Sequence, residues 1–83
     1  MRTETSPAEE LEHAITQAWQ ETFRIAPIGP DTNFFELGGN SLLAMDLTEL
    51  LQTRLGIEVP ALTLYQYPTI HEMAELIATA ATA

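Results

Sequence analysis

Residues 34–45 read FFELGGNSLLAM and set the organisation of the whole chain. Two glycines interrupt regular structure, and from Ser41 onward apolar residues recur at helical spacing. Gly56 follows this pattern and is typical of the position just past a helix end. The sequence therefore predicts a helix over residues 41–55 that starts directly after a glycine turn.

The predicted helix has one broad apolar face, because six side chains fall together at 100° per residue: Leu43, Ala44, Leu47, Leu50, Leu51 and Leu55. Leu42 and Met45 fall instead on the polar side, beside Ser41, Asp46 and Glu49. These two apolar residues either pack beneath the preceding loop or form a contact surface rimmed by acids.

Residues 24–40 form a long loop, because prolines and glycines block a continuous helix there. The same stretch carries apolar side chains at Ile28, Phe34, Phe35 and Leu37. A long loop with its own hydrophobic anchors is usually packed down and often functional. We expect this one to be fixed against the helices on either side.

A helix is also predicted before the loop. Ser6 and Glu9 have the spacing of a capping box, with Pro7 at the first helical position. An apolar stripe then runs at helical spacing to about Phe23, through Leu11, Ala14, Ile15, Ala18, Trp19 and Thr22.

Two more helices follow residue 60. Residues 61–67 lie between Pro60 and Pro68 and are best read as one short helix. A second capping box, Thr69 and Glu72, opens the last helix. The predicted fold is all-α: a small four-helix bundle of three main helices and one short helix, with a long loop between the first two main helices. We expect one domain over 7–80, a flexible segment over 1–6 and a tail over 81–83.

Composition excludes several functions. The 83 residues carry Lys+Arg 3 against Asp+Glu 12, a net charge of −9, which repels nucleic acid and disfavours anionic membranes. At 46% hydrophobic residues the chain can form a core. It contains no cysteine and no apolar run long enough to span a membrane, and we expect no signal peptide. We expect a soluble, cytoplasmic, monomeric domain.

Catalysis by the chain itself is disfavoured. Ser41 has no G-x-S-x-G context, and His13 and His71 lie outside any motif. No metal-binding spacing occurs, so we predict neither catalytic residues nor a metal site. The simplest alternative for Ser41 is an N-cap, with the two glycines before it forming only a turn. A different interpretation is that the glycines let another molecule approach an uncovered hydroxyl.

The stretch 34–45 resembles the signature of thiolation, or carrier, domains. These include peptidyl carrier domains of nonribosomal peptide synthetases and acyl carrier domains of polyketide synthases. The likeness extends to LGIEVP at 55–60, YPTI at 67–70 and the first helix with Trp19 and Phe23, so that it covers about residues 7–80.

This resemblance implies that a phosphopantetheinyl transferase attaches 4′-phosphopantetheine from coenzyme A to Ser41, beside Gly39, Asn40 and Leu42. The arm would hold acyl or aminoacyl groups as thioesters. A docking strip would serve the partner enzymes, and it consists of Leu42, Met45, Asp46 and Glu49. Those partners would be an adenylation or acyl-loading enzyme and condensation, ketosynthase or tailoring enzymes.

Two glycines before x-Ser resemble peptidyl carriers more than fatty-acid carriers, which commonly place Asp before the serine, where this chain has Asn40. The resemblance therefore implies nonribosomal peptide or hybrid peptide–polyketide biosynthesis. A polyketide-type acyl carrier is one alternative. A non-catalytic acidic helical adaptor that binds a basic partner is another, from a different class of protein.

Overall fold

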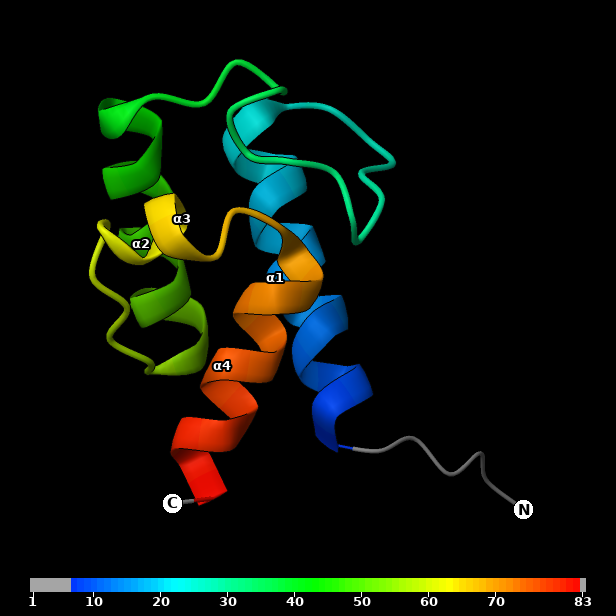
Figure 1. Ribbon diagram of the computed structural model, residues 1–83, viewed down its shortest axis with the longest axis vertical. Coiled ribbons are helices and arrows are strands. Elements are labelled where there is room, and N and C mark those ends of the chain that lie inside the picture. Colours follow the sequence, from blue (N-terminus) through cyan, green and yellow to red (C-terminus); the bar gives the residue numbers. More distant parts are fainter. Residues whose placement is uncertain (1–6, 83) are drawn as a thin grey trace.

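The computed structural model describes residues 7–82, and these residues form four helices joined by loops (Figure 1). The helices are α1 (Pro7–Phe23), α2 (Ser41–Leu55), α3 (Thr63–Gln66) and α4 (Ile70–Thr82). α1 packs against both α2 and α4. The predicted all-α bundle, with three main helices, one short helix and a long loop before α2, is confirmed.

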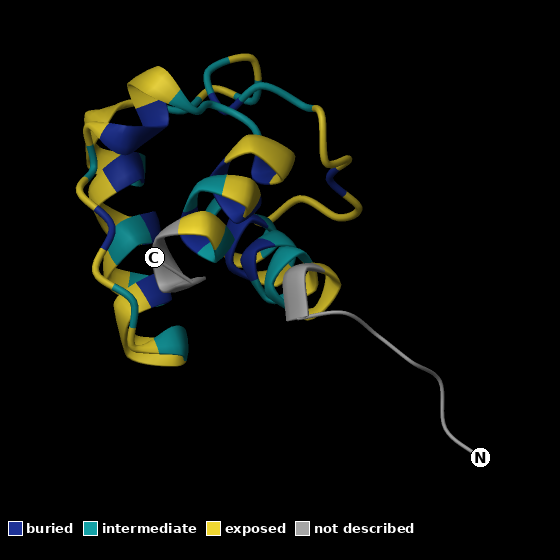
Figure 2. Ribbon diagram, turned by 60° about the horizontal axis from the view of Figure 1, so that its bottom comes forward, coloured by how far each residue is buried: buried dark blue, intermediate teal, exposed yellow. Residues whose placement is uncertain are grey.

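The core lies where the apolar faces of the helices meet, and the buried residues face inward along each main helix (Figure 2). On α2, Ala44, Leu47 and Leu51 are fully buried, and the other three residues of the predicted face are half-buried. The rest of the core comes from α1, the loops, α3 and α4: Ile15, Ala18, Trp19, Ile28, Phe34, Val59, Leu64, Ile70, Met73, Ala74 and Ile77. Full burial of one large apolar side chain contributes about 1.5–3 kcal/mol.

The helix ends follow the sequence signals. Gly56 adopts φ 67° after α2 and donates its N–H to the Gln52 carbonyl at 2.9 Å. At the start of α4, the Thr69 hydroxyl accepts from the Glu72 N–H at 3.1 Å and donates to the Glu72 carboxylate at 3.1 Å. The capping box predicted at Ser6 and the segment 1–6 lie outside the described residues.

The loop between α1 and α2 is held down, as its apolar anchors predict. Ile28 and Phe34 are buried, and Phe35 and Leu37 are half-buried. The Phe34 N–H donates to the Pro68 carbonyl at 2.7 Å, just before α4. The loop therefore approaches the start of α2 from a position fixed against the rest of the bundle.

His71, at the start of α4, lies between two carboxylates. Its Nδ1 is 3.4 Å from Glu12 Oε1 on α1, and its Nε2 is 3.3 Å from Glu75 Oε2 one turn along α4. The hydrogen bond to Glu12 and the charge of Glu75, with a smaller effect of Asp31, raise the pKa of His71 above its ordinary 6.5. Protonation of His71 therefore favours the folded state.

We predict that this histidine makes stability fall as pH rises. The stabilisation is fully present below the unfolded-state pKa of about 6.5 and is lost as pH passes the raised pKa of folded His71. The stability of the His71→Gln protein should not show this decrease with rising pH. Urea midpoints measured for both proteins from pH 5.5 to 8.5 should converge at the alkaline end. Parallel curves would contradict the assignment.

Candidate functional site

Ser41 is the first residue of α2, and its side chain is exposed. The helix is capped by the residue before it. Asn40 has extended backbone angles, its Oδ1 accepts from the Leu43 N–H at 2.9 Å, and its carbonyl accepts from the Ala44 N–H at 2.9 Å. The alternative that Ser41 is merely the N-cap is therefore wrong. The Ser41 hydroxyl is not used to start the helix.

Because Asn40 caps α2, we predict that Asn40→Ala destabilises the fold by about 1 kcal/mol, the usual cost of losing an N-cap. Asn40→Asp should stay close to the natural protein, because a carboxylate oxygen accepts the same bond. Urea unfolding followed by circular dichroism measures both. An Asn40→Ala midpoint equal to that of the natural protein would assign the cap elsewhere.

The two glycines before Asn40 have internal roles. Gly38 adopts φ 95°, a conformation that other residues rarely adopt, and its α-carbon faces open space. A Cβ on Gly39 would lie 2.3 Å from two ring carbons of Phe34 and 2.7 Å from the Phe34 carbonyl oxygen. Gly39 is therefore required by the loop's own aromatic ring, and the interpretation that the two glycines let another molecule approach Ser41 stays a prediction.

A series of aromatic rings fixes the loop that precedes Ser41. The buried Phe34 ring meets Trp19 at 5.3 Å between centroids, Phe23 at 5.0 Å and Phe35 at 5.2 Å, all edge to face. Phe35 then contacts Tyr65 of α3 at 4.9 Å. The loop is thereby joined to α1 on one side and α3 on the other.

The strip next to Ser41 is open to solvent. Leu42 is 67% exposed and Met45 is 60% exposed, so the alternative that they pack beneath the loop is wrong. Both line a groove of about 410 Å³ between α2 and the segment that leads into α3. The other lining residues are Asp46, Thr48, Glu49, Gln52, Glu58, Val59, Pro60 and Ala61. All four predicted docking residues therefore meet at one groove.

The structure shows further exposed residues that the sequence reasoning missed, at α3 just after Ala61 at the edge of this groove. Leu62 is 66% exposed and Tyr65 is 53% exposed, and they lie one turn apart at α3. Glu58 adds a third carboxylate to the groove beside Asp46 and Glu49. Leu62 and Tyr65 have i, i+3 spacing, the one sequence signal that could have placed them on a common face.

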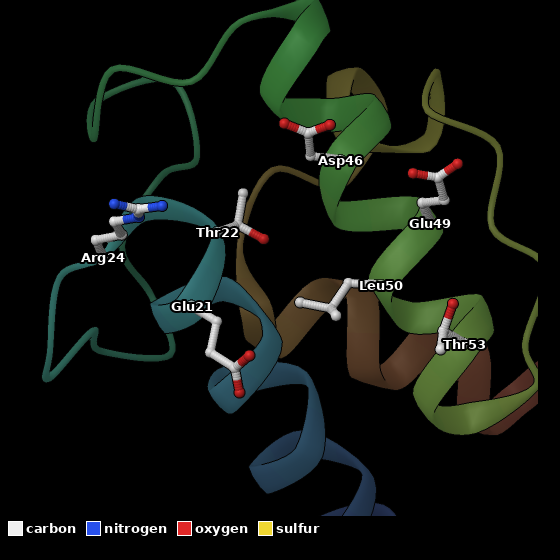
Figure 3. A pocket seen from close by; sticks show the side chains of 7 residues that line it. All are labelled: Glu21, Thr22, Arg24, Asp46, Glu49, Leu50 and Thr53. Atoms are coloured by element: carbon white, nitrogen blue, oxygen red, sulfur yellow. The ribbon is translucent and has the colours of Figure 1, made fainter.

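A second groove, of about 520 Å³, lies between the end of α1 and α2 (Figure 3). Asp46 and Glu49 line this groove as well, so they form a ridge between the two hollows. On its α1 side, Glu21 accepts hydrogen bonds from both terminal nitrogens of Arg54, and this pairing lowers the pKa of the Glu21 carboxyl. Asp46 and Glu49 have no such cationic partner among the described residues.

Both histidines, which lie within residues 7–82, have contacts with other side chains. His13 contacts Gln17 on its own helix at 3.2 Å, and both ring nitrogens of His71 face carboxylates. Within residues 7–82, no group of three metal-ligating side chains gathers. No helix in this part of the chain is long and apolar enough to cross a membrane. What remains is an exposed hydroxyl at a helix start beside an apolar, acid-rimmed surface.

An exposed serine hydroxyl at a helix start, beside an apolar surface rimmed by acids, fits a site that another protein can reach. The chain belongs to the family described as "Phosphopantetheine attachment site", whose profile matches residues 13–77. It is 42% identical over 71 residues to surfactin synthase subunit 1 of Bacillus subtilis (strain 168). That match covers 86% of this chain but only 2% of the synthase.

Solved structures agree with this assignment. The type-II acyl-carrier-protein BlmI from Streptomyces verticillus, involved in bleomycin biosynthesis, superposes with a TM-score of 0.82 at 27% identity, over 88% of each chain. A peptidyl carrier protein solved in complex with the phosphopantetheine transferase Sfp and coenzyme A superposes with a TM-score of 0.78 at 28% identity, over 95% of this chain and 99% of that one. The protein is a non-catalytic carrier whose cofactor is covalent 4′-phosphopantetheine.

The start of α2 fits a phosphodiester. The first turn of a helix leaves N–H groups without helical partners, and Asn40 satisfies those of Leu43 and Ala44. The N–H groups of Ser41 and Leu42 have no partner within the described residues. They lie beside the Ser41 hydroxyl at the positive end of the helix dipole, which favours an anionic group.

Proposed function

We propose that Ser41 carries the 4′-phosphopantetheine arm and that the protein presents acyl or aminoacyl thioesters to partner enzymes in nonribosomal peptide or hybrid peptide–polyketide biosynthesis. The observation that carries this proposal is the exposed hydroxyl of Ser41, which the cap at Asn40 leaves unused. When bound, the cofactor supplies a terminal thiol that forms thioesters. We place this activity in the cytoplasm and in one carrier domain over residues 7–80.

The attachment reaction needs only a reachable hydroxyl from this chain. The Ser41 oxygen forms a bond to the phosphorus next to the pantetheine in coenzyme A. The bond from that phosphorus to the adenosine 3′,5′-bisphosphate breaks, and the hydroxyl proton passes to the transferase. Since both histidines contact other side chains, we assign the base to the transferase.

Mass spectrometry tests the proposal. Incubation with a broad-specificity phosphopantetheinyl transferase and coenzyme A should add the mass of one phosphopantetheinyl group. Tandem mass spectrometry of the proteolysed protein should place that group on Ser41. No mass gain, or a gain on another residue, would overturn the proposal.

We further propose that the docking strip receives the partner enzymes, together with Leu62 and Tyr65 on α3. Support comes from the exposed apolar residues and the carboxylates around one groove. Apolar residues rimmed by acids suit reversible contact with basic-rimmed surfaces. The transferase, an adenylation or acyl-loading enzyme and a condensation, ketosynthase or tailoring enzyme would each use this surface in turn.

Met45→Asp is predicted to lower kcat/KM of the partner enzymes for the carrier about tenfold, because it removes an apolar contact and buries a charge at the interface. The circular dichroism spectrum should not change, since Met45 is exposed in the unbound protein. Gln17→Asp is the matched control, because it makes the same charge change at an exposed residue of α1 outside the strip. The partner enzymes should turn over this variant normally. Equal turnover of the two variants would remove Met45 from the docking strip.

Fold similarity does not separate the polyketide-type alternative from the peptidyl branch, because a type-II acyl carrier superposes with a TM-score of 0.82 and a peptidyl carrier with 0.80. The 42% identity to a surfactin synthase subunit favours the peptidyl branch. The enzyme that loads the arm distinguishes the peptidyl branch from the polyketide branch. Among adenylation enzymes supplied with amino acids and acyltransferases supplied with malonyl-coenzyme A, we expect the former to charge the phosphopantetheinylated protein faster.

A further inference from the structure

The surface around Ser41 offers few side chains that accept acyl groups. The chain contains neither lysine nor cysteine, and its cations are the arginines at positions 2, 24 and 54. Lysine amines and cysteine thiols are the side chains that attack thioesters most readily. A guanidinium stays protonated at physiological pH and has no lone pair available for attack.

The groove beside Ser41 likewise lacks amine and thiol side chains. Its lining consists of hydrocarbon side chains, a thioether, an amide, three carboxylates and one hydroxyl. That hydroxyl belongs to Thr48, which donates its proton to the Met45 carbonyl at 3.0 Å. Attack by a carboxylate would give an anhydride, which is less stable than the thioester and returns the acyl group.

The two histidines are not placed to accept the acyl group from the thioester. His71 has a carboxylate at each ring nitrogen, and these contacts favour the imidazolium, which has no lone pair for attack. His13 points along α1 to Gln17. Neither side chain lines the groove beside Ser41.

The arm can sample most of this groove. An extended phosphopantetheine has about fourteen bonds between the serine oxygen and the sulfur, which span roughly 18 Å at ordinary bond lengths. Gln52 lies eleven residues beyond Ser41 on the same helix, or about 16 Å along its axis. The reactive thioester can therefore meet the side chains from Leu42 to Gln52.

We propose that the groove beside Ser41, within reach of the tethered thioester, is lined by side chains that do not readily accept acyl groups, so that the cargo stays on the arm until a partner supplies the nucleophile. This inference rests on the proposed attachment at Ser41. The reaction that consumes the loaded carrier is then an acyl transfer to an amine, carbon or water nucleophile brought by another protein. The groove itself contributes neither an amine nor a thiol as a competing acceptor.

The test introduces one acyl acceptor within reach of the arm and, in a second variant, one beyond its reach. A thiol at residue 52 would form a new C–S bond as the arm's C–S bond breaks, and its proton would pass to the departing thiolate. Gln52→Cys and Glu10→Cys both place a thiol on an exposed residue. Glu10 lies near the start of α1, at the end of the bundle opposite the start of α2 (Figure 1).

Each protein is loaded with an acetyl-pantetheine arm from acetyl-coenzyme A, and only molecules that show the added mass are followed. In the natural protein, the thioester should decay within about twofold of free acetyl-pantetheine. Neutral hydroxylamine, which cleaves thioesters but not amides, should then remove all acetyl mass. Residue 52 of Gln52→Cys should become acetylated at least tenfold faster than residue 10 of Glu10→Cys, at a rate independent of protein concentration.

Two results would overturn this inference while leaving the attachment at Ser41 intact. One is acetyl mass on the natural chain that resists hydroxylamine, which would reveal an acceptor among its own residues. The other is equal acetylation of residues 52 and 10, which would show that reach does not control transfer. Failure to gain the arm in the first step would instead contradict the proposed function.

Discussion

The Ser41→Ala protein is expected to gain no phosphopantetheine at all while it keeps its fold. The modification forms a bond to the serine oxygen, and alanine has no atom to replace it. The fold should persist because Asn40, and not Ser41, caps α2 and accepts the Leu43 N–H. We expect the free energy of unfolding to change by less than about 0.5 kcal/mol, as for other exposed substitutions.

The sequence offers a matched control for this experiment, because its only other serine is Ser6. Ser6→Ala should gain one phosphopantetheinyl group as fast as the natural protein does. Intact-mass measurement after incubation with the transferase and coenzyme A compares all three proteins. A full mass gain on Ser41→Ala would disprove the assignment, and a shifted urea midpoint would show that Ser41 also supports the helix.

Helix positions could be predicted from the sequence because they depend on local chemistry, whereas attachment at Ser41 rests on the family resemblance and stays a prediction. Apolar periodicity, capping residues and a glycine after Leu55 each act over a few residues. The identity of the cap could not be predicted in the same way. Asn40 and Ser41 are both good N-cap residues, and only the backbone angles place Asn40 at that position.

The proposed docking surface also contains some residues that could be predicted from the sequence and others that could not. The exposure of Leu42 and Met45 follows from the helical period of α2, because that period also places the buried leucines. Glu58 reaches the same groove, and Leu62 and Tyr65 are exposed at α3, only through the path of the chain after α2. That path depends on tertiary packing, including the contact of Phe35 with Tyr65, which has no local sequence signal.

The largest effect on stability is expected for Gly39→Ala. The added methyl group would lie 2.3 Å from two carbons of the Phe34 ring and 2.7 Å from its carbonyl oxygen. Phe34 is fully buried and meets Trp19 and Phe23, so its ring has no free space to move into. We expect a loss of about 3 kcal/mol, the upper part of the usual range for overpacking. Urea unfolding measures this loss.

Gly38→Ala is the matched control, because it adds the same methyl group one residue earlier into open space. Its φ of 95° makes it strained, and we expect a loss of about 1–2 kcal/mol. If the Phe34 ring causes the larger effect, Gly39→Ala should cost less in a Phe34→Leu background, where the side chain can yield. A Gly39→Ala loss no larger than that of Gly38→Ala would mean that the loop moves away from α2. Ser41 would then depend on the aromatic packing less closely than the structure indicates.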